Sequence, residues 1–166
     1  MKTLARTFGL YQFLTAVILF ALSLIGTHQG DYSSSEILGY TAILLSLWGI
    51  FPGLKNYRSA HNQTLGFAQG LGIGLFLTSF SALGISLVDY LYTSVVNPDF
   101  LSEFLTRSLA EMKATMTAEE FRIQSLEFKS QMEVFSSSGA MAGFMFVTVS
   151  LMGLVVSLVA TLIYKK

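Results

Sequence analysis

The stretch SSSGAMAGFMFVTVSLMGLVVSLVATLIY, residues 136–164, contains no charged side chain and is followed at once by Lys165 and Lys166. An α-helix rises about 1.5 Å per residue, so about 20 residues cross the roughly 30 Å hydrocarbon core of a bilayer. A surface helix of a soluble protein carries one polar face, whereas Phe144–Ile163 is apolar or small on nearly every side. The stretch is therefore predicted to be a transmembrane helix.

Three more stretches lack charge and have a similar length, and they cover residues 7–27, 37–54 and 66–88. A cleaved signal peptide is an alternative for the first of them, but its apolar run continues past Ala21, which favours a retained span. The chain is predicted to be all-α, a four-transmembrane-helix bundle that forms a single membrane domain over residues 1–166.

The basic residues of the short flanking segments predict how the bundle is oriented. Lys and Arg accumulate on the cytoplasmic side of membrane helices. Here they precede span one, separate spans two and three and follow span four: Lys2, Arg6, Lys55, Arg58, Lys165 and Lys166. Both termini are therefore predicted to be cytoplasmic, with Lys55 and Arg58 forming a basic rim. Pro52-Gly53 is expected to end span two at this rim.

The composition excludes several classes of protein. Acidic and basic residues balance at ten each, so no global charge favours nucleic acid as a partner. Cysteine is absent, which removes disulfides, thiolate catalysis and cysteine-ligated metals. Residues 92–135 hold seven acidic and four basic side chains, a net charge of −3. We expect anionic lipid headgroups to repel this segment.

Residues 97–135 are predicted to form an extracytoplasmic amphipathic helical hairpin between spans three and four. Asn97-Pro98 has the pattern of a helix start, and Thr117–Glu120 has the spacing of a capping box that begins a second helix. Apolar residues recur on one side of the first helix, among them Phe100, Phe104, Met112 and Met116. Two interpretations remain open: this stripe packs within the protein, or it docks a partner.

Small residues four positions apart predict where the spans approach one another, because helices in lipid associate through close backbone contact. The glycines with this spacing are Gly66, Gly70 and Gly74 in span three, Gly49 and Gly53 in span two, and Gly139 and Gly143 in span four. Either the same chain or a second copy in a homo-oligomer could fill these grooves.

No catalytic, cofactor-binding or metal-binding motif is present, so we expect no enzyme and no cofactor. The histidines His28 and His61 fall on opposite sides of the membrane in this topology and cannot share a site. Asp89 is the ionisable residue nearest the interior of a span. Exposure to water at the outer interface is the simpler expectation for it, and proton or cation binding is the alternative. In that case Ser86, Thr78 and Ser79 would be the polar lining to test.

Four segments resemble a family of small bacterial membrane proteins, the domain-of-unknown-function 4199 family: Phe51–Arg58, Leu65–Gly70, Ile73–Leu75 and Asn97–Phe100. The likeness extends over essentially the whole chain. It implies the same order of two spans, a basic turn, a third span, an acidic helical segment and a last span. It implies no activity and supplies no catalytic residue.

The expected function is that of a multi-pass protein of the bacterial inner membrane that acts without catalysis. Its acidic extracytoplasmic segment would serve as an interaction or scaffold module for a membrane or periplasmic protein. The alternative is a small oligomeric transporter or channel that uses the polar positions of span three.

Overall fold

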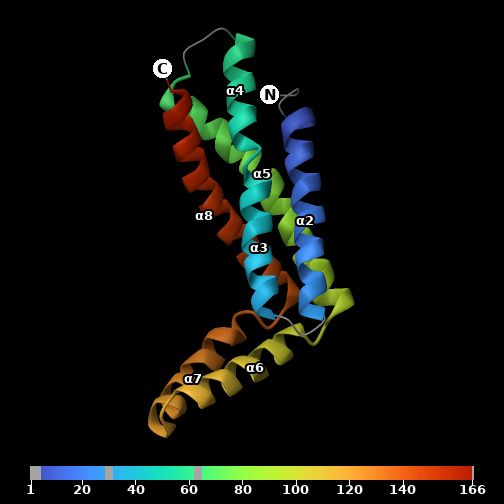
Figure 1. The fold of residues 1–166 in the computed structure, drawn as a ribbon, viewed down its shortest axis with the longest axis vertical. Helices are drawn as coiled ribbons and strands as arrows, with labels where there is room; N and C mark the ends of the chain where they lie inside the picture. Colours follow the sequence, from blue (N-terminus) through green and yellow to red (C-terminus); the bar gives the residue numbers. More distant parts are fainter. Residues whose placement is uncertain (1–4, 29–31, 62–64, 166) are drawn as a thin grey trace. The chain divides into compact units, whose positions relative to one another are not determined.

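The computed structural model describes residues 5–28, 32–61 and 65–165 of the chain. These ranges contain helices and no strand, which confirms the all-α prediction. Figure 1 labels the α-helices. The elements are η1 (Ala5–Gly9), α2 (Leu10–His28), α3 (Tyr32–Leu47), α4 (Ile50–His61), α5 (Phe67–Leu91), η2 (Tyr92–Val96), α6 (Phe100–Thr115), α7 (Ala118–Glu133) and α8 (Ser138–Tyr164).

Four helical stretches are long and apolar enough to cross a membrane, as the sequence predicts. They are Arg6–Ile25, Ile37–Ala60, Phe67–Val96 and Ser138–Tyr164. The second and third continue beyond the predicted limits at residues 54 and 88. In the second span helix can continue because the long basic side chains of Lys55 and Arg58 can reach the aqueous interface.

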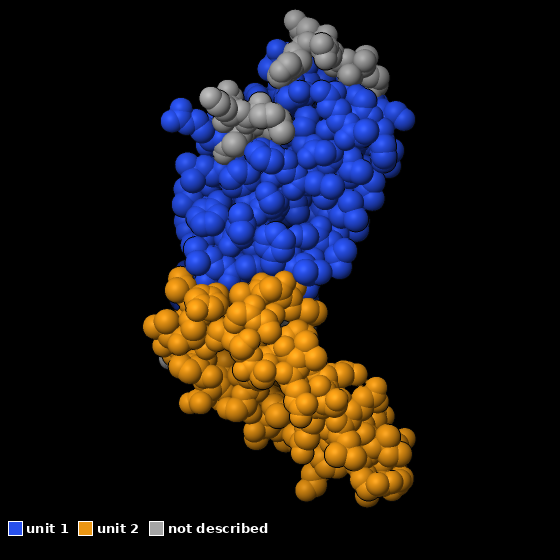
Figure 2. All heavy atoms as spheres, turned by 180° about the vertical axis from the view of Figure 1, so that it is seen from behind, with its two compact units in different colours: residues 1–88, 145–166 blue, residues 89–144 orange. Residues whose placement is uncertain are grey.

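The chain divides into two compact units, coloured separately in Figure 2. Unit 1 consists of residues 1–88 and 145–166 and contains most of the spans, and unit 2 consists of residues 89–144. The sequence predicts one membrane domain, and the structure divides it more finely. Unit 2 is compact because α6 and α7 are amphipathic helices that pack on each other.

Unit 1 exposes apolar side chains on its surface and buries polar ones, as expected for a protein surrounded by lipid. From Leu10 to Ile25 one side of α2 is apolar and exposed, through Leu10, Leu14, Ile18, Leu22 and Ile25, which are 48–57% accessible. Polar side chains lie inside instead: Gln12, Ser46, Ser81 and Ser157 are all 0% exposed. A continuous apolar surface of this kind would be a liability in water but matches the chemistry of acyl chains.

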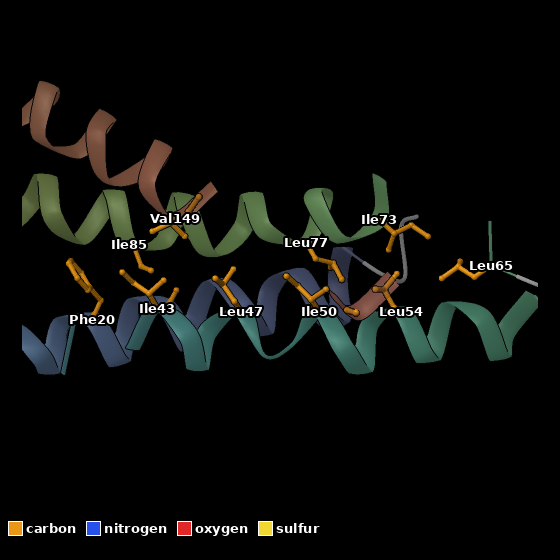
Figure 3. Close-up of a cluster of buried hydrophobic side chains, with 13 residues drawn as sticks. Phe20, Ile43, Leu47, Ile50, Leu54, Leu65, Ile73, Leu77, Ile85 and Val149 are labelled. Atoms are coloured by element: carbon orange, nitrogen blue, oxygen red, sulfur yellow. The ribbon is translucent and has the colours of Figure 1, made fainter. Parts of the chain in front are cut away.

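The core of unit 1 is a column of aliphatic side chains between the second and third spans (Figure 3). Leu47, Ile50 and Leu54 follow one another along α3 and α4 and lie opposite Leu77 of α5. Each of the four is fully buried. The column therefore fixes the third span against both halves of the second.

The second span is not one continuous helix, and the prediction that Pro52-Gly53 ends it was wrong. Helix α4 runs through Pro52 to His61, and the interruption lies upstream, at a turn formed by Trp48 and Gly49. In a regular helix the ring of Pro52 would overlap with the carbonyl group four residues before it, which belongs to Trp48. The helix accommodates the collision by turning there, where Phe51 N–H donates to the Trp48 carbonyl at 3.2 Å, and then resumes.

The predicted helix start at Asn97-Pro98 was also displaced. Helix α6 begins at Phe100 with Asp99 as its N-cap, and Asn97 instead ends the preceding π-helical segment η2. The Asn97 N–H donates to the Tyr92 carbonyl at 2.7 Å, a bond that spans five residues. The Asn97 side chain still serves α6, because its amide donates to Glu103 Oε2 at 3.0 Å.

Candidate functional site

Several hydroxyl groups in the interior of unit 1 are satisfied within their own helices, whereas those of Ser81, Ser86 and Thr161 have no hydrogen-bond partner among the described residues. Thr78 Oγ1 donates to the Gly74 carbonyl at 2.9 Å, and Ser79 Oγ donates to the Phe76 carbonyl at 2.7 Å. Ser46 Oγ likewise bonds to the Ile43 carbonyl at 2.8 Å. Such bonds place a hydroxyl in a membrane interior without creating a path for a solute.

The four polar positions predicted on the third span do not share one environment. Thr78 faces α8, where its Oγ1 lies 3.5 Å from Ser157 Oγ. Ser79 is only partly buried. Ser86 is also partly buried, yet its Oγ is shielded and has no hydrogen-bond partner among the described residues.

Asp89 is buried, contrary to the expectation of a water-exposed side chain at the interface. Only 9% of the residue is accessible, and its Oδ2 has no hydrogen-bond partner among the described residues. The next turn of unit 2 packs closely, since Tyr92 is 6% and Thr93 5% exposed and Thr93 Oγ1 donates to the Asp89 carbonyl at 2.9 Å. A carboxyl group in this position has capacity left to bind a proton or a cation.

Helices α5 and α8 meet through small residues that alternate between the two helices. A β-carbon placed on Gly70 would lie 2.7 Å from Thr161 Cγ2, and one on Gly74 would lie 2.6 Å from Ser157 Cβ. One turn further the roles reverse, and Gly153 of α8 receives the side chain of Thr78. Steps of four residues in opposite directions define an antiparallel helix pair whose groove is filled by the same chain.

The other predicted packing glycines fall into two groups. Gly49 and Gly53 receive side chains of the neighbouring spans, Gln12 and Leu77 respectively. A β-carbon on Gly66, Gly139 or Gly143 would have no atom of another described segment within 4 Å. Their four-residue spacing therefore marks no contact within the described chain, because a groove needs a facing helix as well as small residues.

The sequence pattern missed Gly84, which lies where α5 approaches α2. A β-carbon there would be 2.9 Å from the Phe13 carbonyl oxygen and 3.1 Å from Ala16 Cβ. The residues four positions before and after Gly84 are Phe80 and Val88, which are large. Gly84 is therefore not part of a small-residue repeat that would predict a helix contact. The partner backbone alone explains why glycine is needed.

The predicted basic rim lies on helix α4, not in a loop. Lys55 is exposed and Arg58 partly buried. In Figure 1 the far end of α4, the start of α5 and the end of α8 lie at the same end of unit 1. Two contacts join them there: Gln69 Nε2 donates to Tyr57 Oη at 3.1 Å, and Lys165 Nζ lies 5.8 Å from the centre of the Phe67 ring.

The apolar stripe of α6 takes part in the packing of unit 2, although none of its residues is fully buried and Phe104 is 38% exposed. Phe104 packs against Phe128 of α7 with ring centres 6.5 Å apart, and it stacks on Phe100 at 6.3 Å. Phe100, Met112 and Met116 are only partly accessible. More open apolar side chains stand on α7, where Ile123 is 55% and Leu126 62% exposed.

The predicted capping box at the start of α7 is confirmed. Glu120 N–H donates to Thr117 Oγ1 at 3.4 Å, and the Thr117 N–H donates back to Glu120 Oε2 at 3.0 Å. The Thr117 hydroxyl adds a third bond to the same carboxylate oxygen at 2.7 Å. The bonds from the Thr117 hydroxyl and then from its backbone N–H hold the pKa of Glu120 below its ordinary value of 4.5.

This pKa shift gives a pH-dependent prediction for the full chain. The pKa of the Glu120 carboxyl is lower in the folded chain than its ordinary value of 4.5, so the ionised carboxylate stabilises the folded state. This stabilisation is fully present above pH 4.5 and is lost as the pH falls through the folded pKa. Thr117→Ala should reduce the hydrogen-exchange protection of the first turn of α7 at neutral pH, with a shrinking effect below pH 4.5. Thr106→Ala is the matched control, since its hydroxyl bonds within its own helix, to the Ser102 carbonyl. A difference between Thr117→Ala and the parent chain that is the same at every pH would contradict the prediction.

The described residues contain no group of three or more His, Asp or Glu side chains placed to hold a metal ion. A family model described as "Protein of unknown function (DUF4199)" matches residues 7–166 of the chain. No curated protein and no solved structure matches it.

Proposed function

We propose that the chain, which belongs to the DUF4199 family of unknown function, is a noncatalytic interaction protein of the bacterial inner membrane. Its four apolar helices make it a membrane protein by length and composition. The acidic segment of unit 2, on the extracytoplasmic side, would contact a membrane or periplasmic protein. Both termini would be cytoplasmic.

The orientation is supported by the charge pattern. Lys55, Arg58 and Lys165 lie on or directly beside helices that end together in unit 1, while the segment from residue 92 to 135 carries a net charge of −3. Short basic segments are retained on the cytoplasmic side, so the acidic segment would lie outside. Tags at the two termini that report different compartments would contradict this topology.

The observation that carries the interaction proposal is the apolar side of α7 that faces away from α6. Ile123 and Leu126 stand about 140–200° around the helix from Phe128, the residue that packs on α6. They are 55% and 62% exposed, although each would be more stable out of water. Glu127 lies next to Leu126, whereas Glu119 is paired with Arg122 at 2.8 Å, so the partner would present a basic group toward Glu127 beside an apolar centre.

A photocrosslinking amino acid at Leu126 tests this surface in intact cells. We expect it to capture one reproducible protein, and we expect Glu127→Lys to weaken the capture because it reverses the charge beside the contact. A crosslinker at Ser125 is the matched control, since Ser125 is adjacent in sequence but only 8% exposed. Capture of lipid alone at Leu126, or equal capture at Ser125, would refute the proposal.

A small proton- or cation-conducting oligomer is the second candidate, and the buried carboxyl of Asp89 favours it. A buried carboxylate with one oxygen, Oδ2, lacking a hydrogen-bond partner among the described residues is costly in a membrane unless it binds a proton or a cation. The interrupted second span adds support, because helix breaks accompany the binding sites of many transporters.

Liposome flux measurements test this candidate. Asp89→Asn should reduce proton or cation flux at least about tenfold if the carboxylate lies on the path. Thr41→Val is a suitable control, since Thr41 is exposed and its hydroxyl bonds within its own helix, to the Ile37 carbonyl at 2.8 Å. Absence of flux through the parent protein, or equal flux through Asp89→Asn, would exclude conduction by this route.

A further inference from the structure

We infer that the second membrane span is a jointed helix, bending at Trp48-Gly49, and that the Gln12 side chain is the latch that holds the joint closed. The joint lies midway along the span, which runs from Ile37 to Ala60. Trp48 and Gly49 form a turn there between the two rigid pieces α3 and α4. A break at this depth matters because no water is present to bind the freed backbone groups.

The turn leaves the first N–H of α4 without its usual acceptor. In a continuous helix, Ile50 N–H would donate to the carbonyl of Ser46, four residues earlier. In the structure the side chain of Gln12 in α2 takes that role. With the amide oriented to satisfy both of its ends, Gln12 Oε1 accepts from Ile50 N–H at 3.2 Å and Nε2 donates to the Leu77 carbonyl at 2.9 Å.

This bridge connects three spans through one fully buried side chain. Gln12, Ile50 and Leu77 are each 0% exposed, and they belong to α2, α4 and α5. Figure 3 shows Ile50 beside the break and Leu77 opposite it. An uncharged amide supplies both a donor and an acceptor, so it can complete the break without placing a charge in the membrane.

The glycine at the turn lets Gln12 reach the joint. A β-carbon on Gly49 would lie 2.8 Å from Gln12 Cγ, which leaves no room for a larger residue at the turn while the latch is in place. The sequence thus combines a proline that interrupts the helix, a glycine that clears space and a glutamine that satisfies the exposed backbone.

On one side of the joint, no packed side chains of the described residues cover the turn. A hollow of about 300 Å³ opens there, with Tyr11, Leu45, Trp48 and Pro52 among its walls. Trp48 is 66% exposed, so no packed protein layer opposes its displacement within the described chain. Bending would therefore swing α4, with Lys55 and Arg58 on it, relative to α3.

Spin labels measure this motion directly, since the chain has no cysteine of its own. Labels introduced through Thr41→Cys in α3 and Ser59→Cys in α4 flank the joint at exposed positions. About 27 Å separates positions 18 residues apart along a straight helix, a span that pulsed dipolar spectroscopy resolves. In bilayer nanodiscs we expect one narrow distance distribution for the parent chain and a broadened or displaced one for Gln12→Leu. The Ile50 amide should exchange with deuterium roughly tenfold faster in Gln12→Leu.

Two further variants keep the inference decisive. Ser23→Ala is the matched control, because Ser23 is a buried polar residue of α2 whose hydroxyl bonds within its own helix, to the Phe20 carbonyl at 2.7 Å. Gln12→Glu should behave like the parent at acidic pH, where the neutral carboxyl still offers one donor and one acceptor. At alkaline pH the carboxylate can only accept, so the bond to the Leu77 carbonyl is lost and the distance distribution should broaden. Should Gln12→Leu fail to fold, the pH dependence of Gln12→Glu decides alone. The inference that Gln12 holds the joint closed would be contradicted by unchanged spin-label distances in Gln12→Leu. Equal changes in Ser23→Ala, or distances in Gln12→Glu that do not depend on pH, would also contradict it.

Discussion

Gly74→Leu is expected to lower the free energy of unfolding by about 3 kcal/mol, the upper part of the range for overpacking a close contact. A β-carbon on Gly74 would lie 2.6 Å from Ser157 Cβ and 3.2 Å from Ser157 Cα. A flexible side chain can rotate away from such an overlap, but the backbone of α8 cannot. Helices α5 and α8 would have to separate. In lipid no hydrophobic effect drives two helices together, so the lost packing contacts are not replaced.

The measurement is unfolding of the purified protein in mixed micelles, followed by circular dichroism as the denaturing detergent increases. Gly72→Leu is the matched control, two residues away in the same helix and with no atom of another described segment within 4 Å. It should unfold like the parent chain. Equal stability of Gly74→Leu and Gly72→Leu would show that the α5–α8 contact does not hold the bundle together.

Gly84→Leu is expected to have a comparable effect, about 2–3 kcal/mol, through a different pair of helices. Its β-carbon would lie 2.9 Å from a backbone atom, the Phe13 carbonyl oxygen of α2. The overlap therefore pushes α2 from α5 and strains the nearby bridge from Gln12 to the Leu77 carbonyl. The same unfolding assay applies, and protease sensitivity of α2 should rise with the loss of stability.

Gly143→Leu provides the comparison for this second variant. Gly143 is part of a regular four-residue glycine repeat with Gly139, yet it has no atom of another described segment within 4 Å. Gly84 has no such repeat but has a backbone contact. Greater damage from Gly143→Leu than from Gly84→Leu would mean that a second protein covers the Gly139–Gly143 surface.

The sequence predicted local features well. Length and absence of charge identified four spans, because hydrocarbon imposes a minimum helix length and excludes ionised groups. The capping box at Thr117 and Glu120 was also predictable, since both partners lie within one turn and need no other part of the chain. The prediction for Asn97-Pro98 was wrong because the same two residues also fit the end of a π-helical segment, and only the backbone conformation distinguishes these roles.

The candidate sites were less predictable because burial depends on neighbours distant in sequence. Asp89 was expected at a water-exposed interface from its position beside Tyr90 and Tyr92, but the fold leaves it 9% exposed. Gln12 carries no sequence signal, since a single amide in an apolar helix has no distinctive spacing. Its importance appears only when Ile50 and Leu77 are brought to it from two other spans.

The sequence alone determined that the chain is helical, that four segments suit a bilayer and that an acidic helical segment separates the last two. These properties follow from period, length and charge, which each segment carries by itself. The tertiary structure decided which glycines touch another helix, that the second span resumes beyond its proline, and which polar side chain completes the break. Those outcomes depend on what faces each residue across a helix interface, and packing between distant segments sets that partner.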